Sequence, residues 1–368
     1  MYTPVFDFLG SVVRSRNFRA TCPMLLSAIF IGLAVPVARC QTTSSSGVNV
    51  LNTGSLSLTN PSGLTANDMA DAVSPKLMKD LIYKTVNGEQ IKLDLFIPAG
   101  ATQPTPLVIL IHGGGWVGGN KDGFDGDALR WAKRGYAAAS VDYRLTDEAQ
   151  FPAQIEDVKA AVRWLRAHAQ EYNFDPNRFA AMGHSAGGHL AALLGTSGDI
   201  SRFDVGDNLN FSSKVQAVVD MAGPVDLPLF FAPKSGSPSK SIPLFGGTLE
   251  DKKDLVILAS PIFHIGADTP PFLIISGLND TAVGTVQPQL MYAALQKAGI
   301  PCQLMLIPGV PHGIHLDLPY GKGQLWDAVY YFLDSVLKKK KDNSSSAADT
   351  DMRPFLPAAT STSRQFAH

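Results

Sequence analysis

The sequence has few cysteines, almost no net charge and no long apolar run, and each absence excludes a class of protein. Three cysteines in 368 residues cannot form a disulfide-rich fold, and only Cys302 lies outside the N-terminal segment. A formal net charge of −1 gives no electrostatic basis for binding nucleic acid or an anionic membrane surface. We therefore expect a globular protein with no nucleic-acid partner. The sequence does not indicate its oligomeric state.

The N-terminal segment has the composition of an export signal. Several arginines precede an apolar run at residues 23–38, which at about 16 residues is short for a bilayer span. Small and polar residues follow, so residues 1–40 are predicted to be a secretory signal peptide that is cleaved before Gln41. A lipoprotein site at Cys40 and an uncleaved anchor are the alternatives. We expect a secreted or periplasmic protein with no stable membrane partner after cleavage.

Between two polar stretches, short apolar runs alternate with helical patterns. Residues 41–64 are predicted to be a linker and residues 339–368 a disordered tail, because both are rich in Ser, Thr and Ala. Within residues 65–338, strands that alternate with helices indicate one α/β domain with a parallel sheet covered on both faces. In such sheets, active sites lie at the carboxyl ends of the strands.

One strand, RFAAMGHS at residues 178–185, ends at a serine between two glycines. The pattern Gly183-x-Ser185-x-Gly187 then opens a helix. This context predicts a sharp turn that presents the hydroxyl of Ser185, with the helix N-terminus favouring negative charge beside it. A serine that merely caps the helix is the alternative. We predict that Ser185 is a nucleophile.

A serine nucleophile requires a base, and the base requires an acid. His312 lies in the loop between the last predicted strand and the final helix, and Asp280 follows the strand before it. We predict these two residues as base and acid, with Asp226, one strand earlier, as the alternative acid. The chain order Ser185, Asp280, His312 is the order typical of an α/β-hydrolase.

Three other histidines are weaker candidates. His315 could form a metal-binding pair with His312, but no nearby carboxylate cluster completes such a site, so we expect no metal and no cofactor. His184 and His189 flank the serine on the wrong sides of a tight turn. They are expected to pack or to form hydrogen bonds behind the site.

Consecutive glycines follow another predicted strand, in HGGGW at residues 112–116. Glycines allow the backbone N–H groups to turn toward a developing oxyanion. Gly114 and Gly115, together with Ala186 next to the serine, are the expected donors of an oxyanion hole.

Three aromatic residues are candidate walls of the substrate site. Trp116 ends the glycine-rich loop, and Phe230 and Phe231 follow a later strand, where they could equally be local core. The span of residues 223–271 has room for loops but not for a large lid. A small cover of this kind favours a short acyl group.

Several segments resemble the hormone-sensitive-lipase-like esterases over roughly residues 81–337: HGGGW, VDYRL, FPAQIEDVKAAVRWLRAHA and GHSAGGHLAALLG. LASPIFHI, PPFLIISGLNDTAV and PGVPHGI are similar to the secreted branch that includes bifunctional feruloyl and acetylxylan esterases. The resemblance implies an α/β-hydrolase fold with a mostly parallel eight-stranded sheet, helices on both faces and a small cap. It implies the same triad and oxyanion donors, and it makes Asp142 and Arg144 packing residues. Ser276 replaces a histidine that the family often has before the acid, which is expected to alter the rim of the site.

Together these features predict a secreted serine carboxylesterase that acts on short-chain acyl esters. Acetylated or feruloylated plant polysaccharide is the expected substrate class. The alternatives are an amide hydrolase similar to the arylformamidases, which share the GHSAG motif, and a non-catalytic ligand-binding member of the fold.

Overall fold

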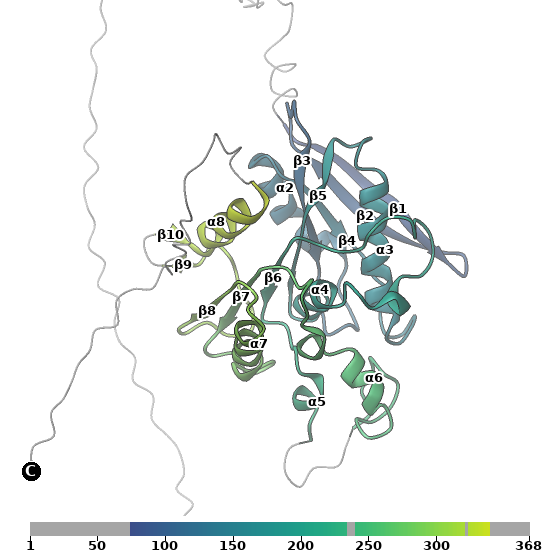
Figure 1. Cartoon of the computed structure of the whole chain (residues 1–368), viewed down its shortest axis with the longest axis vertical. Helices are drawn as coiled ribbons and strands as arrows, with labels where there is room; N and C mark the ends of the chain where they lie inside the picture. Colours follow the sequence, from purple (N-terminus) through teal and green to yellow (C-terminus); the bar gives the residue numbers. More distant parts are fainter. Residues whose placement is uncertain (1–73, 234–239, 321–322, 339–368) are drawn as a thin grey trace, which may run out of the picture. The chain divides into compact units, whose positions relative to one another are not determined.

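The computed structural model describes residues 74–233, 240–320 and 323–338 (Figure 1). The predicted signal peptide, the linker and the tail of residues 339–368 lie outside these ranges. In the described part of the chain, no helix combines the length and the apolar character needed to cross a membrane.

An eight-stranded sheet forms the centre of the domain, in the order β1-β2-β4-β3-β5-β6-β7-β8 (Figure 1). β1 pairs antiparallel with β2, and β2 pairs antiparallel with β4, whereas the other pairs are parallel. The predicted fold, a mostly parallel eight-stranded sheet, is confirmed. The strands are β1 (Lys76–Val86), β2 (Glu89–Ile97), β3 (Thr105–Ile111), β4 (Ala137–Val141), β5 (Phe174–His184), β6 (Ala217–Met221), β7 (Phe272–Gly277) and β8 (Cys302–Ile307).

The central strands are apolar at nearly every position because helices cover both of their faces. Every residue of β3, TPLVILI, is buried. Its side chains alternate between two apolar layers: Leu107 and Ile109 pack with one, Val108 and Leu110 with the other. This alternation is the period-two geometry of a strand, and it explains why a continuous apolar run forms a strand here.

Helices form the two outer layers. α3 and α4 contribute to one apolar layer, and α2 and α8 contribute to the other, where Trp131 and Trp326 pack edge to face. The helices are α2 (Asp125–Lys133), α3 (Ala153–Ala167), α4 (Ala186–Thr196), α5 (Leu227–Phe230), α6 (Lys253–Leu258), α7 (Val286–Lys297) and α8 (Leu325–Leu337), with 3-10 turns η1 (Lys121–Phe124), η2 (Ser201–Phe203) and η3 (Pro261–His264). A short hairpin, β9 (Pro319–Tyr320) and β10 (Gly323–Gln324), precedes α8.

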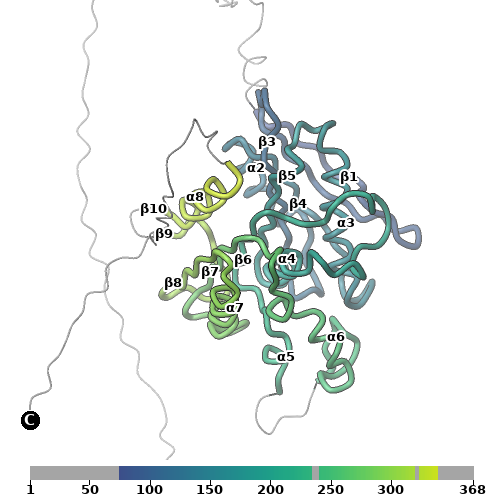
Figure 2. The backbone as a smooth tube through the Cα atoms, viewed as in Figure 1, coloured from purple at the N-terminus to yellow at the C-terminus, as the bar shows by residue number. Residues whose placement is uncertain are grey.

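The predicted small cap corresponds to the segment between β6 and β7. The backbone tube shows α5 and α6 below α4 in this view (Figure 2). Aromatic rings connect this segment to the domain, since Phe231 lies 6.1 Å from Phe245, which lies 5.8 Å from Phe151 between ring centroids.

Two elements differ from the sequence prediction. β5 begins at Phe174, four residues before the predicted strand, because Phe174 pairs with Thr105 across a register shift. Pro176 in this stretch gives it the composition of a turn. α2 was not predicted, since its mean hydropathy is low and few of its residues are buried.

Candidate active site

Ser185 occupies the sharp turn between β5 and α4. Its backbone has φ 58° and ψ −121°, a left-handed conformation that a non-glycine residue rarely adopts. The side chain does not cap the helix. Its Oγ instead lies 2.8 Å from Nε2 of His312. The capping alternative is therefore wrong for this structure.

Gly183 and Gly187, on either side of the serine, must be glycines because neighbouring backbone atoms approach them closely. A Cβ atom on Gly183 would overlap the carbonyl of Gly187, and one on Gly187 would overlap the carbonyl of Ile111 at the end of β3. Glycine at both positions lets α4 begin directly against the neighbouring strands. The N-terminus of α4 is thereby fixed beside the hydroxyl of Ser185.

His312 and Asp280 complete a chain of hydrogen bonds from the serine. His312 Nδ1 lies 2.8 Å from Oδ2 of Asp280, while its Nε2 faces Ser185. Asp280 follows β7, and His312 follows β8. The alternative acid, Asp226, is used elsewhere: its Oδ1 accepts the N–H of Leu229 and caps α5.

Asp280 is held in the ionised form by its hydrogen bonds. Burial alone would raise the pKa of this carboxyl. The bonds from His312 and from the backbone N–H groups of Val283 and Ala282 outweigh burial, so the pKa of Asp280 lies below its usual value. An ionised carboxylate here can fix one tautomer of His312 and stabilise a positive charge on the ring.

The HGGGW loop follows β3, next to the strand that carries Ser185. Gly114 and Gly115 have φ values of 118° and 63°, and Val117 N–H donates to the carbonyl of Gly114 across the turn. Both glycines are exposed. Within the described ranges, the N–H groups of Gly114, Gly115 and Ala186 donate to no backbone acceptor outside regular helices and strands. These three donors are the ones that sequence analysis predicts for the oxyanion hole.

Residues of the VDYRL segment support this loop, and one of them was not predicted. Tyr143 donates its hydroxyl to the carbonyl of His112 at 2.9 Å, and the two rings stack with centroids 4.2 Å apart. Asp142 accepts the N–H of Lys121, where the loop ends. The signal that could have identified Tyr143 is its position two residues after the end of β4, which pairs with β3. Arg144 forms a bidentate pair with Asp157 of α3 and so packs as predicted.

The three predicted substrate-binding residues are less open than expected. Trp116 is only 6% exposed, and its indole N–H donates to His189. Phe230 and Phe231 are partly buried and pack against the core, and Phe231 lies 6.2 Å from Trp116 between ring centroids. Contact of any of them with substrate stays a prediction.

Three other residues considered in the sequence analysis, His184, His315 and Ser276, lie outside the hydrogen-bond chain of Ser185, His312 and Asp280. His184 Nε2 lies 2.8 Å from the carbonyl of His312 and so braces the loop that carries it. His315 is exposed, and both ring nitrogens of His312 face Ser185 and Asp280, so these two histidines do not form a metal pair. The expectation that Ser276 alters the site rim is wrong, because this residue is fully buried within β7.

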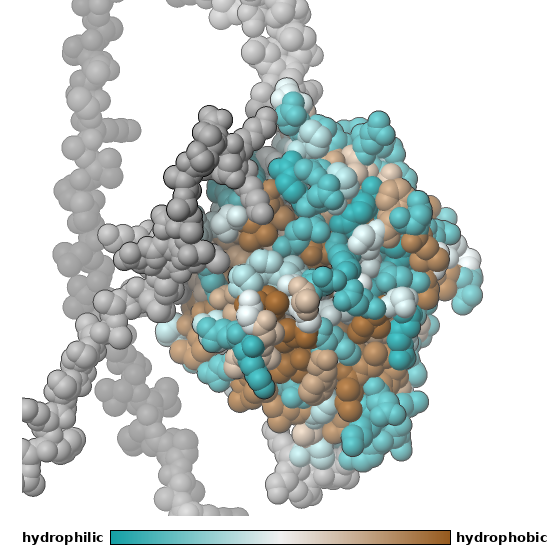
Figure 3. All heavy atoms as spheres, in the orientation of Figure 1, coloured by the Kyte–Doolittle hydropathy of each residue, from teal (hydrophilic) through white to brown (hydrophobic). Residues whose placement is uncertain are grey.

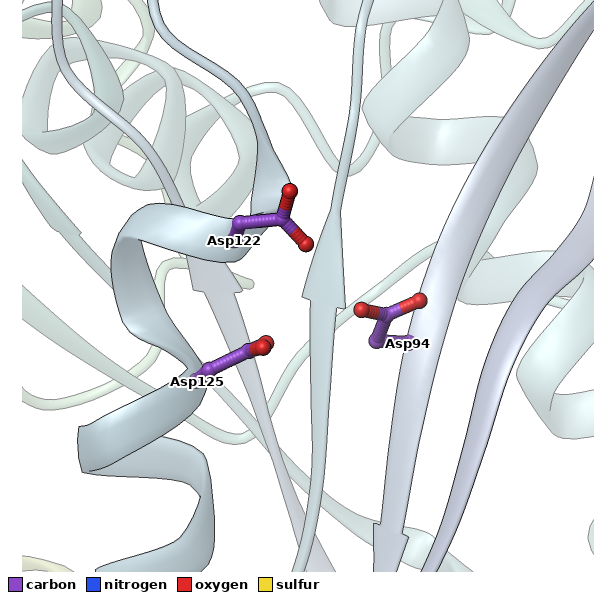
Figure 4. Close-up of side chains that lie close together, drawn as sticks. All are labelled: Asp94, Asp122 and Asp125. Atoms are coloured by element: carbon purple, nitrogen blue, oxygen red, sulfur yellow. The ribbon is translucent and has the colours of Figure 1, made fainter.

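A cluster of carboxylates lies away from the serine, where β2, η1 and α2 meet (Figure 4). Oxygens of Asp94, Asp122 and Asp125 lie within 4.8 Å of one another. Lys79 lies within 3.3 Å of all three, and Lys121 lies 3.1 Å from Asp94. Two ammonium groups pair with these three carboxylates and offset most of their charge, so the cluster acts as an ion-pair network that ties the first strands to the end of the HGGGW loop.

Comparison with known proteins agrees with this geometry. The chain is 29% identical over 244 residues to esterase LipC of Mycobacterium tuberculosis, covering 65% of this chain and 60% of LipC. A truncated carbohydrate esterase from gut microbiota superposes with a TM-score of 0.65 at 28% identity, covering 73% of this chain and 99% of that one. Propionate-bound esterase Est2 of Thermogutta terrifontis superposes with a TM-score of 0.58 at 27% identity, covering 75% of this chain and 97% of Est2.

The fold and the relatives define an α/β-hydrolase similar to the hormone-sensitive-lipase-like esterases, which confirms the resemblance seen in the sequence. Residues 93–295, more than half of the chain, match the family described as BD-FAE. The chain therefore belongs to the BD-FAE family. It spans about half the length of the curated relatives that it matches.

Proposed function

We propose that this protein is a secreted serine carboxylesterase that acts on short-chain acyl esters through an acyl-enzyme. The observation that carries the proposal is the unbroken hydrogen-bond chain Ser185–His312–Asp280, with both links at 2.8 Å. A serine, a histidine and a carboxylate in this arrangement can hydrolyse an ester, with the serine as nucleophile, the histidine as base and the carboxylate as its support.

In the proposed reaction, Ser185 Oγ attacks the carbonyl carbon of the ester while His312 Nε2 accepts its proton. The N–H groups of Gly114, Gly115 and Ala186 donate to the oxyanion of the tetrahedral intermediate. His312 then gives the proton to the leaving alcohol as the C–O bond breaks. Water, deprotonated by the same histidine, releases the acid and regenerates the serine.

The proposed short acyl group is supported by the small cap and by the apolar residues around the strand ends. Val117, Leu278 and Val286 are exposed apolar residues on the loops or helix starts that follow β3 and β7. On the face shown in Figure 3, apolar residues also gather over the area of α4 and α7. Such surfaces suit a small acyl or aromatic acyl group. Similarity to a carbohydrate esterase supports a polysaccharide ester as the substrate class.

A fluorophosphonate probe tests the nucleophile. Wild-type protein should be labelled and should hydrolyse nitrophenyl acetate, whereas Ser185→Ala should do neither. Ser201→Ala, which alters an exposed serine of η2, is the matched control and should behave like wild type. Labelling that survives Ser185→Ala would refute the assignment. A formanilide included beside the esters separates an esterase from an amide hydrolase, since faster cleavage of the formanilide contradicts the proposal.

A further inference from the structure

His189 is fully buried in the first turns of α4 and lies between two groups with fixed hydrogen-bonding roles. Its Nε2 lies 2.7 Å from the carbonyl of Ala259, and its Nδ1 lies 3.2 Å from Nε1 of Trp116. The carbonyl can only accept and the indole N–H can only donate. One tautomer of a neutral ring, protonated at Nε2, therefore satisfies both partners.

The surroundings keep this ring neutral. Burial lowers the pKa of His189 to about 4, although the bond to the carbonyl of Ala259 opposes the shift. At neutral pH the lone pair of Nδ1 is thus available to the indole of Trp116. Both ring nitrogens face partners other than the Ser185 hydroxyl, so His189 is not a base for the reaction.

Trp116 needs such a partner because its backbone is strained. Its φ of 63° is a conformation that a bulky residue rarely adopts. It directly follows Gly114 and Gly115 in the loop, so rotation of its backbone would re-aim their peptide groups. Besides the bond to His189, its carbonyl accepts the N–H of Thr146.

We propose that His189 is a positioning residue for the oxyanion loop. By holding the indole of Trp116, it keeps that residue in its left-handed conformation and keeps the N–H groups of Gly114 and Gly115 directed at the reacting carbonyl. The inference rests on the proposed function, since those two N–H groups are its oxyanion donors. It connects the helix that follows the nucleophile to the loop that stabilises the transition state.

Two substitutions of His189 separate its two bonds. Asn places its oxygen near the position of Nδ1 and can still accept the indole N–H. Gln places its amide near the position of Nε2 and can still donate to Ala259, but it leaves the indole of Trp116 without an acceptor. If the ring acts through Trp116, His189→Gln lowers kcat and His189→Asn retains most of it.

The expected loss can be bounded. Removing one oxyanion donor outright lowers kcat by about 10²–10³-fold. Misdirecting the donors should lower kcat by less than removing one. We therefore expect His189→Gln to lower kcat by about 10- to 100-fold with little change in KM. His189→Asn should lower kcat by less than about threefold. Trp116→Phe should cause a loss similar to that of His189→Gln, and the double variant should lose no more than either.

Backbone amide resonances of Gly114 and Gly115 provide a readout that needs no activity. Both should shift in His189→Gln and stay in place in His189→Asn. Unmoved glycine resonances in His189→Gln, or equal kcat losses in the two variants after active-site titration, would overturn the positioning role. If wild-type protein hydrolyses no ester, the proposed function fails, while the glycine resonances still decide whether His189 positions the loop.

Discussion

Asp220 is a buried carboxyl whose titration should make the stability of the protein depend on pH. It lies on β6, where it pairs with Gly183 of β5, and is 1% exposed. One oxygen accepts the N–H of Gly223, and the other has no hydrogen-bond partner in the described part of the chain. Burial raises the pKa of Asp220 from 3.8 to about 7, with the bond from Gly223 opposing the shift.

The sign of the effect follows from proton binding. The unfolded chain releases this proton near pH 3.8, whereas the folded protein keeps it until about pH 7. The free energy of unfolding therefore falls as the pH rises through this window. The full effect is about 4 kcal/mol, because each unit of pKa shift is worth about 1.4 kcal/mol, and about 2–3 kcal/mol of it falls between pH 5 and 8.

Asp220→Asn removes the titration and keeps an acceptor for Gly223. Urea denaturation of wild type and variant at pH 5 and pH 8 should show the variant gaining about 2–3 kcal/mol relative to wild type at the higher pH. Asp251→Asn, which changes an exposed carboxyl, is the matched control. If the difference between Asp220→Asn and wild type is the same at both pH values, the raised pKa is refuted.

Three further predictions concern the reaction and the maturation of the chain. Asp280→Asn should lower kcat by about 10³-fold or more, the scale of losing a triad acid, while Asp226→Asn should not; the reverse result would assign the other carboxyl. Over nitrophenyl esters, kcat/KM should peak between acetyl and butyryl, because added methylenes gain about 0.8 kcal/mol only where they can be buried. Rates that still rise at dodecanoyl would indicate a long acyl groove. The mass of exported protein should correspond to a chain starting at Gln41, whereas a lipid-modified start at Cys40 would show a lipoprotein.

The parallel sheet could be predicted because its strands are continuous apolar runs. The final helix, α8, was predicted because its apolar residues keep a helical period up to Leu337. α2 was missed because only Ala128, Trp131 and Ala132 are buried in it, so its apolar face covers little more than one turn. The start of β5 was missed because Pro176 masks a stretch that tertiary pairing with β3 holds extended.

The polar residues of the candidate site could be predicted because each lies on the turn or loop that follows a strand. The burial of Trp116 could not be predicted, since it depends on α4 placing His189 where an indole N–H can reach it. Ser276 was expected at the rim, but strand periodicity and the register of β7 turn it into the interior. Partners of this kind depend on packing between elements that are distant in the sequence.

Ser185 and His312 are 127 positions apart in the sequence, so their contact forms only when distant parts of the chain come together during folding. Contacts between such distant positions form only after a large loss of chain entropy, and they tend to form late. Because the serine follows β5 and the histidine follows β8, β6 and β7 must be in place before the two side chains can meet. A segment that contains both side chains must therefore extend from the end of β5 to the loop after β8. Ester hydrolysis measured during refolding should therefore report the completion of the sheet, and it should lag behind the recovery of secondary structure.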